Sequence, residues 1–216
     1  PVYGDYIDDN GEGDWDAYDA AYSEYREALQ KLGKGERPDD SAVRRFADQT
    51  AAEIFTGREN TVYSPISLYM ALGMLTELAD GETKQQVMAL LGVSGNEALR
   101  QWTQQLWQQL YHDEQDSALW LGNGLFLNEN MTFHKEPLDV LTEDYYASSY
   151  RLPMGTSRAD KTIAAWLDQQ TNDLLTGDTG AIKTKEIDLL RLYNTIYYKA
   201  AWRAEFSGGS TEKDIF

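Results

Sequence analysis

The 216-residue sequence contains no cysteine and only two histidines, His112 and His134. Without cysteine the chain can form no disulfide bond, thiol nucleophile or Cys-ligated metal site, although this absence does not fix the compartment. Both histidines lie in polar surroundings near predicted loops, where we expect them to be solvated surface side chains. The sequence therefore predicts neither a metal site nor a bound cofactor.

Positive charge is also scarce, because 19 basic residues stand against 36 acidic ones and give a formal net charge of −17. A surface of this sign repels phosphate backbones, so we predict no nucleic-acid partner. The sequence lacks any run of about 18 apolar residues, so we predict no membrane span. No signal peptide is visible at Pro1, and a leader removed before this residue would leave no trace.

The arrangements expected of an enzyme are missing as well. Ser64 and Ser67 flank Pro65, but a nucleophilic serine needs a base within hydrogen-bond reach, and Ser64 lies outside any Gly-x-Ser-x-Gly elbow. The segment Gly122-Asn-Gly124 lacks the third glycine and the helix start of a phosphate-binding loop. Glycines inside a buried strand more often mark the close approach of another element. We therefore predict that the chain is not an enzyme.

The N-terminal 27 residues are strongly acidic, with nine acidic residues and one basic residue. Residues 1–13 are predicted to be a disordered acidic lead-in. We expect an amphipathic helix over about 14–32, packed against the main domain or alternatively against a partner helix, and then a linker at 33–38. The chain would thus consist of an N-terminal extension at 1–40 and a main domain at 41–216. The helix prediction depends on apolar residues at alternating steps of three and four: Trp15, Tyr18, Tyr22, Tyr25, Leu29 and Leu32.

The main domain combines many helices with a few widely separated strands. Apolar periodicity and capping residues predict helices at the following ranges: 41–55, 65–78, 81–92, 99–110, 135–147 and 158–175. Runs rich in Leu, Ile and Tyr predict long strands at 117–127 and 187–198, with a short strand at 60–63. Because the strands do not alternate regularly with the helices, we assign the fold to the α+β class.

Three polar residues stand out in otherwise apolar elements. Ser64 fits the N-cap and Pro65 the N1 position of the helix at 65–78, which leaves Ser67 at N3 without an assigned partner. An unpaired buried amide costs roughly 1–3 kcal/mol, so we predict that Asn194 pairs with the two serines. Asn194 shares one face of the strand at 187–198 with four large residues: Leu190, Leu192, Ile196 and Tyr198.

Four blocks of the sequence stand out by their order and spacing. The first consists of Asn60-x-x-x-Ser-Pro-x-Ser67, Ala71-Leu-Gly-Met-Leu75, Gly81-x-Thr83 and Leu90-Leu-Gly92. The other blocks are Asn123-Gly-Leu-Phe126, Trp166-Leu-Asp-Gln-Gln-Thr171, and Leu192-Tyr-Asn-Thr-Ile-Tyr-Tyr-Lys-Ala-Ala-Trp202 with Phe206, Thr211 and Phe216. Together these blocks resemble the serpin family, the first of them through its second and third helices. Leu78 and Ala200 stand where that family usually has glycine, which are local packing changes.

The resemblance implies the serpin fold, with helices around a large mixed central sheet and further smaller sheets, of which this chain holds the N-terminal part. The reactive loop, its hinge and the last strands are expected to lie after Phe216, in sequence that is missing or forms a separate chain. By resemblance, the complete protein inhibits serine or cysteine proteases, because loop cleavage is followed by insertion of the loop into the central sheet. The alternative is a non-inhibitory serpin that acts as a carrier, chaperone or interaction protein, and the hinge sequence would discriminate the two.

The same resemblance assigns conformational roles to four residues. Ser64, Ser67 and Asn194 would occupy the shutter, the polar cluster beneath the point where the sheet parts. Trp202 would lie in the breach, where the loop first enters, and the helix at 158–175 would cross the front of the sheet. Residues 97–112, where some serpins bind heparin, carry only one fixed positive charge, Arg100, so heparin is not expected as a partner. Secretion is expected from the family, and the acidic N-terminus is either a solubilising segment or a contact for a basic protease surface.

Overall fold

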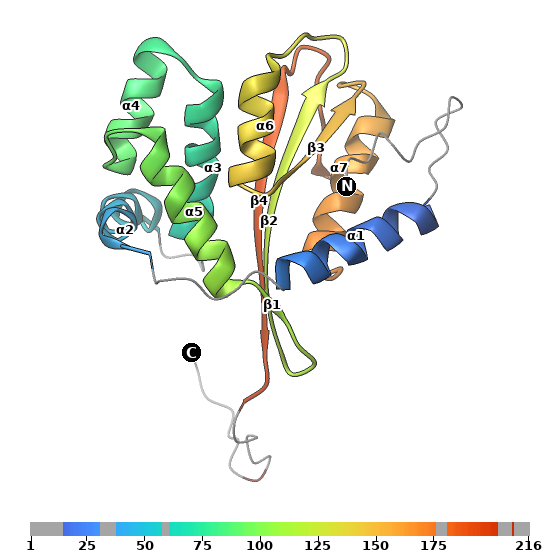
Figure 1. The fold of residues 1–216 in the computed structure, drawn as a ribbon, viewed down its shortest axis with the longest axis horizontal. Helices are drawn as coiled ribbons and strands as arrows, with labels where there is room; N and C mark the ends of the chain where they lie inside the picture. The colour runs from blue at the N-terminus through green and yellow to red at the C-terminus, as the bar shows by residue number, and fades with distance from the viewer. Residues whose placement is uncertain (1–14, 31–37, 58–60, 176–180, 203–208, 210–216) are drawn as a thin grey trace.

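The computed structural model describes residues 15–30, 38–57, 61–175, 181–202 and 209 (Figure 1). Within these ranges the helices are α1 (Trp15–Gln30), α2 (Ser41–Ile54), α3 (Pro65–Leu78), α4 (Gly81–Leu91), α5 (Asn96–Leu110), α6 (Lys135–Asp144) and α7 (Ser157–Gln170). The four strands among the described residues are β1 (His112–Asp113), β2 (Ser117–Asn128), β3 (Ala147–Leu152) and β4 (Leu190–Ala200). The α+β assignment is confirmed.

The four strands form one mixed sheet with β2 at its centre. Along one edge, β2 pairs antiparallel with β4 over residues 117–127. Along the other edge, it pairs parallel with β3 at 123–128 and antiparallel with the short β1 at 118–119. Strands far apart in the sequence therefore lie side by side, as Figure 1 shows for β2 and β4.

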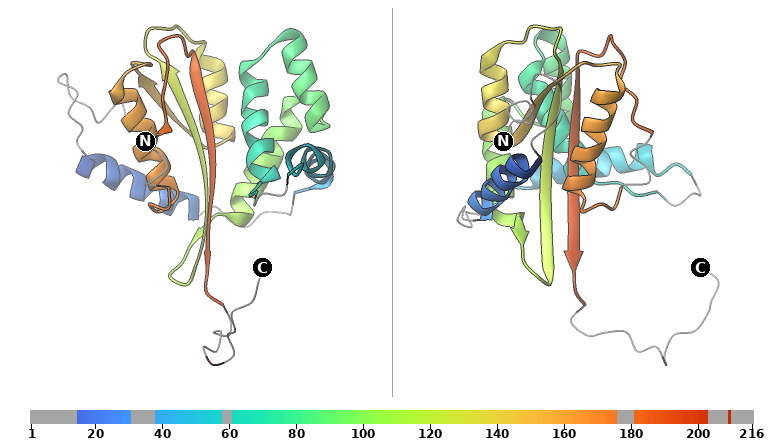
Figure 2. Two further views of the ribbon diagram at one scale, coloured as in Figure 1. Left: turned by 180° about the vertical axis from the view of Figure 1, so that it is seen from behind. Right: turned by 90° about the vertical axis from the view of Figure 1, so that its right-hand side faces the viewer.

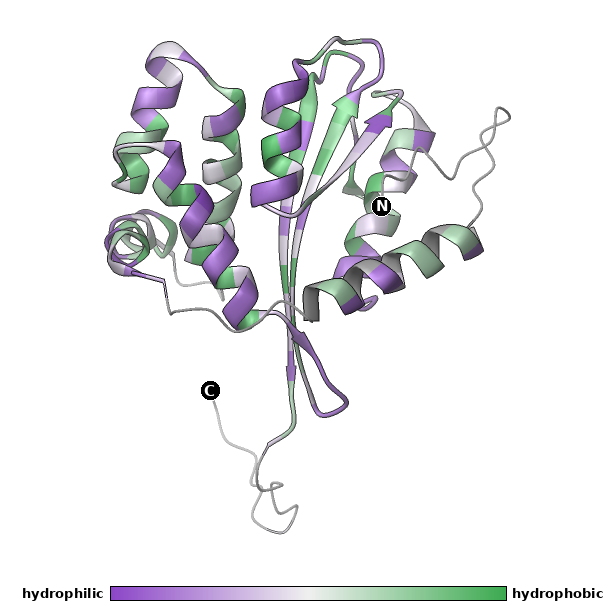
Figure 3. Ribbon diagram, in the orientation of Figure 1, coloured by the Kyte–Doolittle hydropathy of each residue, from purple (hydrophilic) through white to green (hydrophobic). Residues whose placement is uncertain are grey.

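Two layers of helices cover the sheet, and the alternation of side chains along β2 explains why. Leu121, Leu125 and Leu127 belong to the core shared with α2 to α6, whereas Phe126 packs with the apolar face of α7. Figure 2 shows α7 on one face of the sheet and the group containing α3 and α4 on the other. Figure 3 shows that hydrophobic residues dominate β2, while hydrophobic and hydrophilic residues alternate along α5.

The close approach predicted for the glycines of β2 is confirmed, because α7 packs directly against them. A Cβ atom at Gly124 would lie 2.9 Å from the ring of Trp166, and one at Gly122 would lie 2.8 Å from Oε1 of Gln170. Both distances are shorter than side chains tolerate, so only glycine leaves room for α7 at these two positions.

Some predicted boundaries were wrong where pairing between distant segments decides the structure. Residues 61–63 form no strand, and the hydroxyl of Tyr63 instead bonds that of Thr50 at 2.5 Å. The helix predicted to reach residue 147 ends at Asp144, because residues 147–152 pair with β2 as strand β3. The last helix ends at Gln170 rather than 175, and the left-handed backbone of Asn172 and Asp173 follows this end.

The N-terminal helix α1 lies within the predicted range 14–32. The side chains of its apolar stripe, the acidic lead-in at 1–13 and most of the linker at 33–38 lie outside the described residues. The division into an extension and a main domain therefore stays a prediction. Among the helices that the structure describes, none is long and apolar enough to cross a membrane. The described residues also contain no group of three His, Cys, Asp or Glu side chains able to hold a metal ion.

Candidate functional site at the edge strand

Helix α3 begins as the sequence predicts, with Ser64 as its N-cap and Pro65 in its first turn. Ser64 has extended backbone angles, and its Oγ atom accepts a hydrogen bond from the backbone N–H of Ser67 at 3.3 Å. This bond satisfies one of the amide groups that the first turn of a helix leaves free. The role of Ser64 as a cap is therefore confirmed.

The side chain of Ser67 connects α3 to strand β4. Its hydroxyl donates a hydrogen bond to Oδ1 of Asn194, which comes 127 residues later in the chain. The predicted partner of Asn194 is thus present, but only Ser67 makes the bond, since Ser64 is used at the helix end. The amide nitrogen of Asn194 also lies 3.9 Å from the sulfur of Met70, one turn further along α3.

A second asparagine, Asn123 of β2, completes the cluster. Asn123 and Asn194 stand opposite each other in the antiparallel pair, and Nδ2 of Asn194 donates to Oδ1 of Asn123 at 2.7 Å. Nδ2 of Asn123 donates in turn to the backbone carbonyl of Tyr145 at 2.7 Å. Asn123 is only 2% exposed, so these bonds satisfy an amide that water does not reach.

The hydrogen bonds continue from Tyr145 to a buried carboxylate on α3. The Tyr145 hydroxyl donates to Oε1 of Glu77 at 3.1 Å, and the guanidinium of Arg100 donates to both oxygens of Glu77 at 2.9 and 2.8 Å. Nδ2 of Asn96 adds a fourth bond to Glu77 at 2.6 Å. One connected network therefore runs from β4, through β2 and the turn after α6, to helices α3 and α5.

Burial, charge and hydrogen bonds shift the pKa values of the ionisable groups in this network. Burial favours the neutral form of Glu77, but the bonds from Arg100, Asn96 and Tyr145 outweigh burial and hold the pKa of this carboxyl below its ordinary value. Burial, together with the nearby charge of Glu77, raises the pKa of Tyr145. At neutral pH the network therefore contains an ionised Glu77 and a protonated Tyr145.

Sequence reasoning missed Asn123, Glu77 and Tyr145 as members of this network. The argument used for Asn194 also applies to Asn123, which is a lone amide in a strand buried on both faces. It applies to Glu77 as well, because this is the only charged residue of the apolar helix α3. Tyr145 gave no such signal, since a tyrosine at the end of an amphipathic helix is common.

Among the described residues, strand β4 is paired along one edge only. Within the described part of the chain, β2 is the only strand that pairs with it. Asn194 lies near the middle of β4, whereas Trp202 follows the end of the strand and is 74% exposed. The structure therefore brings Ser64, Ser67 and Asn194 together and places Trp202 apart from them.

Comparison with known proteins decides the family. A family model, Serpin (serine protease inhibitor), matches residues 41–216, which is more than half of the chain. The chain belongs to the serpin family. Among curated serpins it is 28% identical to Serpin-Z2B of Triticum aestivum, over 80% of this chain and 46% of that protein. It is 26% identical to Serpin-ZXA of Oryza sativa subsp. japonica, over 73% of this chain and 41% of that protein.

Superposition on solved structures shows that this chain shares the serpin fold. Tengpin, a thermophilic serpin in the latent state, superposes with a TM-score of 0.75 at 24% identity, over 85% of this chain and 50% of tengpin. Emu ovalbumin superposes with a TM-score of 0.74 at 20% identity, over 83% of this chain and 51% of ovalbumin. The chain thus has the N-terminal part of the serpin fold and spans about half the length of the curated relatives it matches.

Proposed function

We propose that this chain is the N-terminal part of an inhibitory serpin, in which a cleaved reactive loop enters the sheet beside β4. The observation that carries the proposal is the bridge from Ser67 to Asn194 and Asn123, which ties α3 to the middle of β4, a strand with one edge that no described strand covers. An added strand pairs its backbone with such an edge. The relevant partner is a serine or cysteine protease.

The bridge consists of hydrogen bonds that can hold β4 in place and can also break when a strand is inserted beside it. Each hydrogen bond of this kind contributes only about 0.5–1.5 kcal/mol net to stability, although leaving one partner unsatisfied costs more. Ser67, Asn194 and Asn123 would therefore hold β4 in place until incoming backbone groups compensate the loss. On this proposal Ser64, Ser67 and Asn194 form the shutter, and Trp202, after the end of β4, marks the breach.

The charges on helix α5 are relevant to whether this serpin binds heparin. Arg100, its only basic residue, is directed toward Glu77 and Asp144 rather than solvent. Because heparin binding needs several exposed basic side chains, we propose that this serpin acts without heparin bound at α5. Secretion stays a prediction from the family.

The test is incubation of the complete protein with a panel of serine and cysteine proteases. An inhibitory serpin forms a covalent complex that survives SDS, and the acylated protease is inactive. Cleavage of the loop without such a complex would refute inhibition and favour the carrier, chaperone or interaction role. A variant with Ser67→Ala serves as a conformational control, because the chemistry of loop cleavage is unchanged while the bond to Asn194 is lost.

A further inference from the structure

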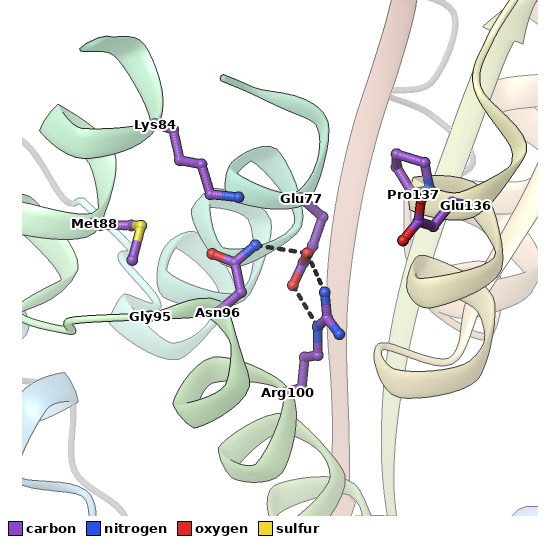
Figure 4. A pocket seen from close by; sticks show the side chains of 8 residues that line it. All are labelled: Glu77, Lys84, Met88, Gly95, Asn96, Arg100, Glu136 and Pro137. Atoms are coloured by element: carbon purple, nitrogen blue, oxygen red, sulfur yellow. Dashed lines mark hydrogen bonds and ion pairs between the residues drawn. The ribbon is translucent and has the colours of Figure 1, made fainter. Parts of the chain in front are cut away.

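A polar pocket lies at the far end of the hydrogen-bonded network, away from strand β4. It has a volume of about 450 Å³, which is within the usual range for small-molecule sites. Figure 4 shows that the last turn of α3, helix α4 and the first turns of α5 and α6 contribute its walls.

The floor of the pocket is an ion pair whose charges cancel. Both oxygens of Glu77 accept hydrogen bonds from Arg100, and the Glu77 side chain is only 4% exposed. Asn96 and Tyr145 complete the bonds to this carboxylate. A ligand therefore meets no free negative charge at the floor.

Two charges of opposite sign remain on the walls. Lys84 comes from α4 and Glu136 from the first turn of α6, and in Figure 4 they lie on opposite sides of the pocket. In the part of the chain that the structure describes, neither side chain forms an ion pair with the other or with a third residue. The pocket thus offers one cation and one anion that a ligand could pair with.

The buried Oδ1 atom of Asn96 is not available for recognition of a ligand. It has no partner among the described residues, but it also has almost no accessible surface, so a ligand in the pocket would not reach it. The contacts that select a ligand therefore come from the two wall charges.

We propose that this pocket binds a small zwitterion of dipeptide size. The ligand carboxylate would pair with Lys84 and the ligand ammonium with Glu136. An apolar side chain next to the ligand carboxylate would lie against Met88, which lines the pocket on the same side as Lys84 (Figure 4). This inference does not depend on protease inhibition, because it uses none of the groups that tie α3 to β4.

Titration calorimetry with glycyl-leucine tests the assignment on the purified protein. We expect a dissociation constant on the order of 1 mM, because a ligand of this size makes few contacts. N-acetyl-glycyl-leucine lacks the ammonium and glycyl-leucinamide lacks the carboxylate, so each should bind about two- to fivefold more weakly. Absence of binding heat up to about 20 mM glycyl-leucine would overturn the proposal. Equal binding of either blocked peptide would also overturn it.

Variants of the two wall charges link the binding to this pocket. Lys84→Met and Glu136→Gln should each weaken glycyl-leucine binding about two- to fivefold. Lys161→Met on α7 and Glu143→Gln on α6 make the same charge changes outside the pocket and should bind like the unaltered protein. All four positions are at least partly exposed, so circular dichroism should show an unchanged fold. Unaltered affinity in Lys84→Met or Glu136→Gln would place the ligand elsewhere and overturn the proposal.

Discussion

Replacement of Asn123 by alanine would cut the bridge between the two central strands at its most buried point. The change deletes the bonds that Asn123 makes to Asn194 and to the carbonyl of Tyr145. It also leaves that carbonyl and the Nδ2 group of Asn194 short of partners in a site that water does not reach. Since each unsatisfied buried group costs about 1–3 kcal/mol, we expect the free energy of unfolding to fall by about 2–4 kcal/mol.

A double-mutant cycle with Asn194→Ala separates the bridge from general damage to the core. Both single variants lose the same hydrogen bond, so the double variant should lose about 1–2 kcal/mol less than the sum of the single losses. Urea unfolding monitored by tryptophan fluorescence gives the three differences, and Asn123→Ala combined with the distant Gln86→Ala on α4 is the additive control. If Asn123→Ala and Asn194→Ala add to within about 0.5 kcal/mol, the two amides do not interact and the bridge has no energetic meaning.

Three further changes test other parts of the argument. Ser67→Phe places a ring where a hydroxyl meets β4, so native gels of the warmed complete protein should show more latent or polymeric forms; an unchanged pattern and unchanged heat stability would contradict the shutter role. Glu77→Gln should lower stability by about 2 kcal/mol at pH 7, because it breaks a partly buried ion pair with Arg100. Because the pKa of Glu77 is lowered in the folded state, its ionised form stabilises the fold above the ordinary glutamate pKa, and this stabilisation is lost as the pH falls through the folded-state pKa. The urea midpoints of Glu77→Gln and the unaltered protein should therefore converge in acid. A difference between the midpoints that stays constant with pH would show that the stability loss does not come from the charge of Glu77. Gly124→Ala brings a Cβ atom to within 2.9 Å of Trp166 and should cost about 1–3 kcal/mol in urea unfolding, whereas no loss would mean that α7 moves away freely.

The features that sequence reasoning predicted well are those that a short segment determines by itself. The start of α3 follows from a serine before a proline, and the need of Asn194 for a partner follows from its place in an apolar row. The central residue of the site, Asn123, was named only within a glycine pattern and within one family block, and neither assigned it a partner. Its role became visible when β2 and β4 were paired in register, since the register places it opposite Asn194.

The features that sequence reasoning missed depend on contacts between distant segments. Strand β3 is short and has a mixed polar pattern, and it exists because β2 offers a parallel partner. The pairing of Glu77 with Arg100 joins two helices, and no local period indicates it. The strand predicted at 60–63 is not formed at residues 61–63, because no described strand lies beside this segment to pair with it.

The one-sided pairing of β4 has a consequence for hydrogen exchange. In an antiparallel pair, alternate amides of a strand point toward its partner, so half of the amides of β4 are protected by β2 and the other half face the open edge. Exchange at the second set should be fast whenever that edge is bare and slow whenever a strand occupies it. Hydrogen exchange of residues 190–200, followed by mass spectrometry, therefore measures the fraction of molecules in which another strand is paired with the second edge of β4.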